Sequence, residues 1–204
     1  MVVFDLDGTL THVDSLWRYL HDAFGTWDYG RAAAQRYRNG EISYRQWAES
    51  DAKYWAGVPI AEVMRILGGI SYMEGAKDVF TELKGRGVKT VILSAGLSLL
   101  AEKAAKELGA DWAVANELRS SDGRLTGEIE VKVGVNNKNQ LVKEIATKFE
   151  IPLEEVALVG DRAFDLANKE CLKIAFLPKD DGARREAHYV VETRNLRAIL
   201  QYLI

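Results

Sequence analysis

Short apolar runs alternate along the chain with segments whose hydrophobic residues recur at helical spacing. This alternation is typical of a parallel sheet covered by helices on both faces, so it predicts an α/β core. The runs that predict strands are residues 2–6, 88–94, 112–115, 156–160, 174–177 and 189–191. The segments that predict helices are residues 76–84, 97–108, 138–149, 164–169 and 194–202.

Residues 13–73 have a different pattern, which predicts a separate helical unit. This segment holds four of the five tryptophans and six of the eight tyrosines. Apolar side chains recur at helical spacing from Leu16 and again from Trp47. We therefore expect a small helical cap at 13–73, inserted over the exit of the first strand into a core formed by residues 1–12 and 74–204. The aromatic residues are expected to form the cap's own core, with a protein or dimer interface as the alternative.

A second feature interrupts the alternation of strands and helices. Residues 116–133 have the sequence NELRSSDGRLTGEIEVKV, in which two polar, β-prone runs flank the pair Asp122-Gly123. Asp-Gly is a frequent hairpin turn because both positions of the turn need positive φ angles. The pattern predicts a β-hairpin that leaves the regular α/β order.

Acidic residues follow the first predicted strand in the sequence FDLDGTL, residues 4–10. Asp5 and Asp7 are two positions apart, so on a strand their side chains project from the same face. Gly8 lets the backbone turn, and the Thr9 hydroxyl can bind a phosphate oxygen or a turn amide. Two carboxylates this close repel each other, so a cation or a proton must offset their charge. Such a pair suits a reaction in which one carboxylate attacks phosphorus and the other transfers a proton. The alternative is an acidic turn without chemistry.

A second acidic motif, GDRAFD, occupies residues 160–165 at the end of an apolar strand. If a helix begins there, Asp161 and Asp165 are four positions apart and can reach one point. Carboxylate oxygens in this number suit Mg²⁺, which takes one or two carboxylates together with water and substrate phosphate. The alternative is that these acidic residues cap the N-terminus of the helix.

Two further positions could hold a phosphate group. Ser94 ends a predicted strand and is followed by Ala95, Gly96 and a helix, so a hydroxyl and free backbone amides meet at a helix start. Serine is also a common helix cap, which is the alternative. Lys138 opens a predicted helix, where its charge opposes the helix dipole, so another group is expected to hold it there. A lysine at this point could bind phosphate and screen Asp5.

The order of these residues resembles the four-motif series of phosphatases of the haloacid dehalogenase superfamily: Asp5 and Asp7, then Ser94, then Lys138, then Asp161 and Asp165. Within that superfamily the chain looks like the phosphoserine phosphatase branch. The stretches EGAKDVFTELKGRGVKTVILSAG, DGRLTGEIE and VVETRNLRAILQYL support this, and the resemblance is least at residues 13–73. It implies a Rossmann-like core with a helical cap, and a Mg²⁺-dependent hydrolase that forms an aspartyl-phosphate intermediate on a small phosphorylated metabolite.

The resemblance also implies a role for each acidic residue. Asp5 would be the nucleophile and a magnesium ligand. Asp7 would be the general acid and then the general base, and its backbone carbonyl would also bind magnesium. Asp161 would be the third protein ligand, and Asp165 would orient metal-bound water or Lys138.

For the phosphoryl group, the resemblance implies Ser94, the amide of Ala95 and Lys138 as its ligands. Such a site stabilises the charge spread over the equatorial oxygens in the transition state. Asp14 stands where that branch carries a glutamate for the substrate amine, so it is a substrate-binding candidate with a shorter side chain. A helix cap is the alternative for Asp14.

Two other positions depart from the phosphoserine pattern. An arginine that pairs with the substrate carboxylate is expected in the cap, and Asp51 occupies that region, where a carboxylate would repel. Arg45 or Lys53 could substitute if the cap helix is rotated. The fourth motif usually carries an asparagine, and here it has Phe164. These departures leave the natural substrate open, with phosphoserine, phosphoglycolate and sugar phosphates as candidates.

The composition of the chain indicates which kinds of partner and which cellular compartment to expect. The formal net charge of −3 argues against nucleic acid as the main partner. We see no secretory signal and no apolar run that approaches the ~18 residues of a membrane span. The single cysteine, Cys171, excludes an intramolecular disulfide and fits a reducing cytoplasm.

Three other functions compete with the phosphatase prediction. A phosphotransferase would pass the aspartyl phosphate to an alcohol, which the sequence cannot separate from hydrolysis because water and alcohol compete for one position. A signalling receiver domain also phosphorylates an aspartate, but its acceptor lies on a middle strand and the domain is far shorter. A catalytically silent binding protein is disfavoured because every residue that the chemistry needs is present.

Overall fold

A sheet of seven strands forms the centre of the computed structural model, which describes residues 1–203. The strands are β1 (Val2–Phe4), β2 (Thr90–Leu97), β3 (Trp112–Ser121), β4 (Arg124–Glu130), β5 (Ala157–Gly160), β6 (Leu172–Phe176) and β7 (Tyr189–Val191). Their order is β4-β3-β2-β1-β5-β6-β7, and all neighbours are parallel except β3 and β4. The predicted α/β fold and its strands are confirmed, although β2 and β3 run further than predicted.

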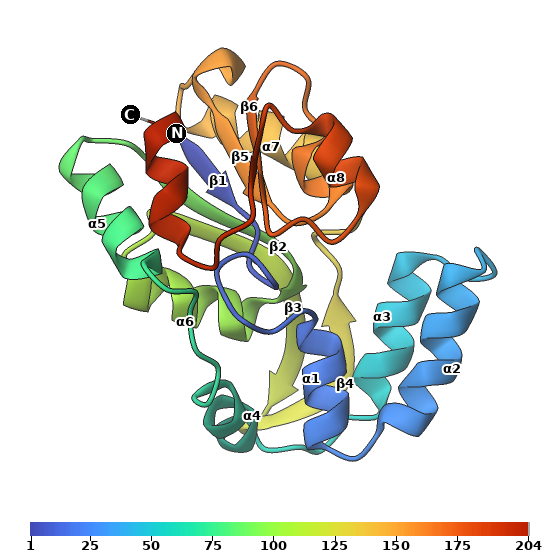
Figure 1. The fold of residues 1–204 in the computed structure, drawn as a ribbon. Helices are drawn as coiled ribbons and strands as arrows, with labels where there is room; N and C mark the ends of the chain where they lie inside the picture. The colour runs from blue at the N-terminus through green and yellow to red at the C-terminus, as the bar shows by residue number, and fades with distance from the viewer. Residues whose placement is uncertain (204) are drawn as a thin grey trace.

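Helices cover both faces of the sheet (Figure 1): α5 (Ala76–Gly85), α6 (Ser98–Leu108), α7 (Lys138–Lys148), α8 (Asp181–Glu186) and the 3₁₀ helix η3 (Leu196–Tyr202). Successive strand residues face opposite sides, so the sheet has two apolar layers. Val2 and Phe4 pack in one cluster with residues of α5, α6 and η3, and Met1 and Val3 pack in another with α7 and α8. Burial on both sides explains why the central strands are apolar throughout.

Two of the predicted helices are 3₁₀ turns instead. Residues 164–169 were expected to be helical, but the chain forms only η2 (Ala163–Leu166), and η3 replaces the helix expected at 194–202. Asp165 accepts a hydrogen bond from the Arg162 N–H (3.0 Å), and Asn168 accepts one from the Glu170 N–H (2.9 Å). These side-chain bonds to the backbone compete with helix propagation and end it after one turn.

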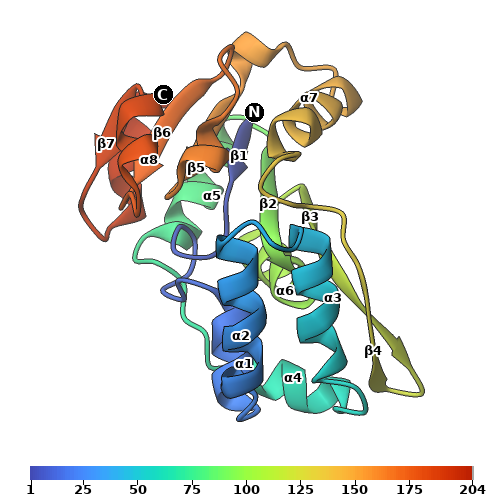
Figure 2. The ribbon, with the colours of Figure 1, turned by 90° about the vertical axis from the view of Figure 1, so that its right-hand side faces the viewer.

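Four further helices lie between β1 and α5: α1 (Leu16–Ala23), α2 (Trp27–Arg38), α3 (Tyr44–Lys53) and α4 (Ile60–Leu67). Ser15 caps α1, and Ser43 forms a capping box with Gln46 at the start of α3. In both views these helices extend beyond one end of the sheet (Figures 1 and 2). Buried residues from them, including Trp17 and Ala52, belong to the same hydrophobic cluster as Phe4, together with Trp55 of the linker between α3 and α4. The predicted helical content of 13–73 is therefore confirmed. No helix within residues 1–203 is long and apolar enough to cross a membrane.

The predicted hairpin is formed by β3 and β4, and it is joined to the helical segment. Its turn has positive φ at Asp122 (51°) and Gly123 (74°). The linker between α3 and α4 bonds to β4: the Gly57 N–H donates to the Leu125 carbonyl (2.7 Å), and the Leu125 N–H donates to the Val58 carbonyl (2.9 Å). The hairpin thus supports α3 and α4. Figure 2 shows β4 beside these two helices.

Two glycine substitutions test the turn geometry. A Cβ at Gly123 or at Gly85 would meet no atom within 4 Å, but only Gly123 has a positive φ. We expect Gly123→Ala to lower the free energy of unfolding by about 1 kcal/mol through backbone strain. Gly85→Ala, the matched control in α5, should raise it by up to about 1 kcal/mol. Urea denaturation measures both, and equal effects would contradict the turn assignment.

Candidate active site

Three buried carboxylates meet at the carboxyl edge of the sheet. β1 and β5 are parallel neighbours, and Asp5 and Asp161 directly follow their last residues. Asp165 follows one turn later in η2. One oxygen from each of the three side chains lies within 4.8 Å of the others. The two acidic motifs, far apart in sequence, therefore converge as predicted, because parallel strands end at the same edge.

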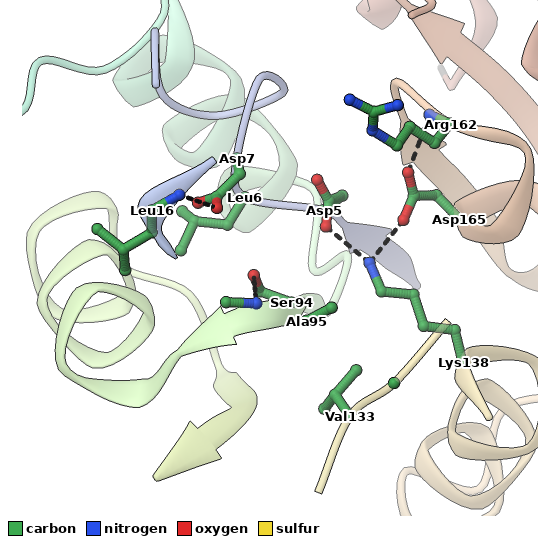
Figure 3. Close-up of polar contacts among 12 residues, drawn as sticks. Asp5, Leu6, Asp7, Leu16, Ser94, Ala95, Val133, Lys138, Arg162 and Asp165 are labelled. Atoms are coloured by element: carbon green, nitrogen blue, oxygen red, sulfur yellow. Dashed lines mark hydrogen bonds and ion pairs between the residues drawn. The ribbon is translucent and has the colours of Figure 1, made fainter. Parts of the chain in front are cut away.

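Lys138 binds two of these carboxylates at once. Its Nζ lies 2.7 Å from Asp5 Oδ1 and 2.6 Å from Asp165 Oδ1 (Figure 3). The lysine is only 3% exposed. Burial lowers the pKa of Lys138, but the charges of Asp165 and Asp5 outweigh this and leave the pKa above its usual value. Phe164 adds an aromatic face, with its ring centroid 5.2 Å from the Lys138 Nζ. The ammonium group thus offsets part of the acidic charge.

Asp161 marks the place where a metal ion fits. Its Oδ2 is buried and accepts no hydrogen bond. Burial, followed by the charges of Asp5 and Asp165, raises the pKa of Asp161 to about 8. A Cβ on Gly8 would lie 2.4 Å from this oxygen, so only glycine at position 8 lets the carboxylate reach its place. Lys138 pairs with Asp5 and Asp165 but not with Asp161, and a divalent cation that prefers oxygen ligands would supply the positive charge that is still missing.

Asp7 lies beside this cluster, but its carboxylate faces another way. Its Oδ2 accepts the N–H of Leu16 at 2.6 Å, and its Oδ1 is buried without a partner. The three-carboxylate group therefore contains Asp165 and not the Asp7 side chain, which is compatible with the expectation that Asp7 binds metal through its backbone. Burial raises the pKa of Asp7 to about 7; the Leu16 hydrogen bond opposes this and the charge of Asp5 adds to it. A carboxyl that titrates near neutral pH is suited to proton transfer.

Ser94 and Ala95 lie across from the acidic residues, at the end of β2 (Figure 3). Ser94 is buried, and its Oγ accepts the Gly96 N–H at 2.9 Å, which leaves the hydroxyl hydrogen free for an oxygen of a ligand. The Ala95 carbonyl accepts hydrogen bonds from Tyr44 Oη (2.5 Å) and Trp17 Nε1 (3.3 Å). Helices α3 and α1 are thereby joined to the part of β2 that the sequence predicts as a phosphate ligand.

Asn116 is a residue of this site that the sequence analysis missed. It is fully buried in β3, and its Nδ2 donates to the carbonyls of Ala95 and Val133, both at 2.9 Å. Its Oδ1 accepts the N–H groups of Lys132 and Val133, both at 2.8 Å. Asn116 therefore fixes both the Ala95 loop and the segment that leads to Lys138. The signal in the sequence is an asparagine that directly follows the apolar run WAVA of the predicted strand.

A cavity of about 540 Å³ lies above these groups. Asp5, Asp7, Ser94 and Asp161 line its floor, and aromatic residues of α1–α3 line its opposite wall. Asp14 lies at its edge with a 70% exposed side chain that pairs with Lys179 (2.7 Å).

Three residues that the sequence offers as substrate contacts, Lys138, Arg45 and Lys53, are not among the residues that line this cavity, and Lys138 contacts Asp5 instead (2.7 Å). Asp51 and Phe164 line it, but Arg45 and Lys53, which could have replaced the missing arginine, are not among the lining residues. Arg45 instead donates to the Val131 carbonyl (3.3 Å).

Comparison with known proteins identifies relatives of similar sequence and similar fold. Residues 2–167 match the haloacid dehalogenase-like hydrolases. The phosphoserine phosphatase of Methanocaldococcus jannaschii is 32% identical over 206 residues, which cover 100% of this chain and 97% of that protein. A substrate-bound phosphoserine phosphatase complex has a TM-score of 0.85 at 29% identity, covering 100% of this chain and 97% of the other. A phospho-aspartyl intermediate analogue of phosphoserine phosphatase has a TM-score of 0.83 at 29% identity, with coverage of 100% and 98%.

These matches span nearly the whole chain and include every strand end that carries an acidic motif. They agree with the resemblance drawn from the order of Asp5, Ser94, Lys138 and Asp161. The chain therefore belongs to the haloacid dehalogenase-like hydrolase family, and its similarity lies with the phosphoserine phosphatases of that family.

Proposed function

We propose that this hydrolase is a Mg²⁺-dependent phosphomonoesterase that acts on a small phosphorylated metabolite through an aspartyl-phosphate intermediate on Asp5. The proposal is carried by one observation: Lys138 holds Asp5 at 2.7 Å beside two other buried carboxylates, at the floor of a cavity of about 540 Å³. Phosphoserine is the first substrate to assay, because similar proteins bear that name. The free, buried Cys171 fits a reducing cytoplasm.

In the first step, a carboxylate oxygen of Asp5 attacks phosphorus and the ester bond to the alcohol breaks. Asp7, with a pKa near 7, gives its proton to the departing alkoxide. Lys138, the Ser94 hydroxyl and the Ala95 amide would hold the phosphoryl oxygens and stabilise their charge in the transition state. The products of this step are a free alcohol and aspartyl phosphate.

In the second step, water attacks the phosphorus of aspartyl phosphate, and the bond to the Asp5 oxygen breaks. Asp7 is now ionised and accepts the proton of that water, so it returns to its starting state when phosphate leaves. We propose that residues 13–73 act as a cap that keeps bulk water from the cavity, since α1 and α3 contribute Trp17 and Tyr44 to its wall.

A magnesium ion would be held by Asp5, Asp161 and the backbone carbonyl of Asp7. Asp165 would hold Lys138 in place through its ion pair with the ammonium group. When bound, it would offset the charge of the carboxylates and of the phosphate group, so that an anionic nucleophile can approach an anionic substrate. The unpartnered Oδ2 of Asp161 is the atom of this chain that most needs such an ion.

The nucleophile is tested by Asp5→Asn. We expect loss of para-nitrophenyl phosphate hydrolysis by at least about 10³-fold, because an amide does not attack phosphorus. Folding should be retained, since Lys138 keeps its 2.6 Å contact with Asp165. Circular dichroism and steady-state rates measure both, and hydroxylamine trapping should detect acyl phosphate only in the wild type. Retained turnover in a folded Asp5→Asn protein would overturn the assignment.

The proton donor is tested by Asp7→Asn. For alkyl phosphates, which have poor leaving groups, the rate should fall about 10²–10⁴-fold. For para-nitrophenyl phosphate, the first turnover should be affected far less, because nitrophenolate leaves without a proton. Rapid-quench measurements should then show accumulation of aspartyl phosphate, because its hydrolysis lacks a base. An equal loss for both substrates would count against Asp7 as the acid.

The metal site is tested by the pH dependence of stability. Because the pKa of Asp161 is raised to about 8 from 3.8, the metal-free protein loses stability as pH rises through that range. We therefore expect the Tm of EDTA-treated protein to fall between pH 5 and pH 8, and the Tm gain from added Mg²⁺ to be larger at pH 8. Asp161→Asn should reduce both effects, and a Mg²⁺ gain that is independent of pH and of this substitution would contradict the site.

A further inference from the structure

The wall of the cavity opposite the acidic floor is built from aromatic rings. Trp47 lies at its centre: Tyr37 stacks on it at 5.0 Å and 14°, Tyr44 meets it edge-on at 5.7 Å and 87°, and Trp17 lies 6.0 Å away. All four residues line the cavity. The faces of such rings attract cations and apolar groups, and tryptophan is the most effective of them.

One carboxylate is buried in this aromatic wall. Asp51 of α3 lines the cavity and is only 1% exposed. Its Oδ2 lies 3.2 Å from His21 Nε2, while its Oδ1 has no hydrogen-bond partner. An unpaired carboxylate oxygen in a buried place costs free energy unless a cation or a donor reaches it. Burial raises the pKa of Asp51, and this is opposed by His21 and by the nearby Trp47 N–H, which itself has no hydrogen-bond partner.

His21 packs directly against Asp51. The Trp55 Nε1–H donates to Thr26 Oγ1 (3.3 Å), and Thr26 Oγ1 lies 2.8 Å from His21 Nδ1. These contacts hold the imidazole ring with Nε2 facing Asp51. A Cβ at Gly30 would lie 2.5 Å from Nε2, so α2 packs directly on the ring and holds it in place.

Within residues 1–203, Asp51 forms an ion pair with His21 and with no arginine or lysine. Three arginines line the cavity: Arg18 is paired with Asp22 (2.7 Å) and stacked on Trp27 (3.8 Å), Arg38 is exposed and donates to Gln35 (2.8 Å), and Arg162 follows Asp161 at the end of β5. A carboxylate that entered the aromatic wall would meet the charge of Asp51 instead, and like charges in a buried site repel strongly.

We propose that the natural substrate is the phosphate monoester of an amino alcohol, with an ammonium group and no carboxylate, whose cationic end lies between Asp51 and the rings around Trp47. This inference rests on the proposed phosphatase function and specifies its substrate class. The phosphate would sit on Asp5, Ser94 and Lys138 at the floor, and the ammonium group would satisfy the open oxygen of Asp51 at the wall. Attraction at both ends then selects cationic leaving groups over neutral or anionic ones.

A pair of isosteric substrates tests the charge with the wild-type enzyme. Phosphocholine and 3,3-dimethylbutyl phosphate have the same shape and differ by a positive nitrogen in place of a carbon. We expect kcat/KM at saturating Mg²⁺ to be at least tenfold higher for phosphocholine. Phosphoethanolamine should likewise exceed phosphoserine, which adds only a carboxylate, by at least tenfold. Equal values within the pairs, or a preference for the neutral ester or for phosphoserine, would overturn the proposal.

A variant pair locates the preference on Asp51. Asp51→Asn should lower the ratio of kcat/KM for phosphocholine over its neutral isostere at least tenfold. Glu49→Gln removes a charge from the same helix, but Glu49 is half-exposed and paired with Arg45 (3.9 Å), so the ratio should not change. An unchanged ratio in folded Asp51→Asn would sink the assignment.

If Asp51→Asn does not fold, the isostere comparison in the wild type decides alone. Hydrolysis of para-nitrophenyl phosphate separates the two levels of the argument. If para-nitrophenyl phosphate is hydrolysed but phosphocholine is not preferred over its neutral isostere, only the proposed substrate class fails. If no monoester is hydrolysed with Mg²⁺, the proposed function fails as well.

Discussion

The contact of Lys138 with Asp5 and Asp165 is the interaction on which the site depends. Without it, three buried carboxylates within 4.8 Å would repel one another and draw protons instead of holding charge. With it, Asp5 keeps an oxygen close to the ammonium group, where a phosphoryl oxygen would also be attracted. The fold supplies this contact by starting α7 at Lys138 beside the ends of β1 and β5. Asp5 and Asp165 are 133 and 27 residues away from that lysine in the sequence. The closeness of these carboxylates therefore destabilises the fold, while the proposed phosphoryl chemistry requires it.

Much of this arrangement could be predicted from the sequence, because strand ends and the order of motifs are local features. Asp5 and Asp161 follow apolar strands, and a parallel sheet brings such ends together whatever the intervening chain does. The position of Lys138 at a helix start was also informative, since its conflict with the helix dipole is resolved by the two carboxylates. These inferences needed no knowledge of side-chain packing.

The features that escaped prediction depend on contacts between distant segments. The spacing of Asp5 and Asp7 suggested carboxylates side by side, yet the Leu16 N–H turns Asp7 away. Asn116 looked like an ordinary polar residue until its bonds to Ala95 and Val133 were seen. The sequence analysis identified Asp51 as a departure from the phosphoserine pattern, but its pairing with His21 joins α1 and α3 and leaves no local trace.

The bonds between β4 and the linker of α3 and α4 constrain how molecules enter the cavity. A lid attached only by its two chain connections could swing as a rigid door. Here Gly57, Val58 and Ile60 also bond to the hairpin, so the helices cannot separate from β4 without breaking these hydrogen bonds. β4 pairs in turn with β3, in a register that shifts between Leu118 and Ser120. Any wider opening of the mouth on this side would therefore have to bend the edge of the sheet together with the helices.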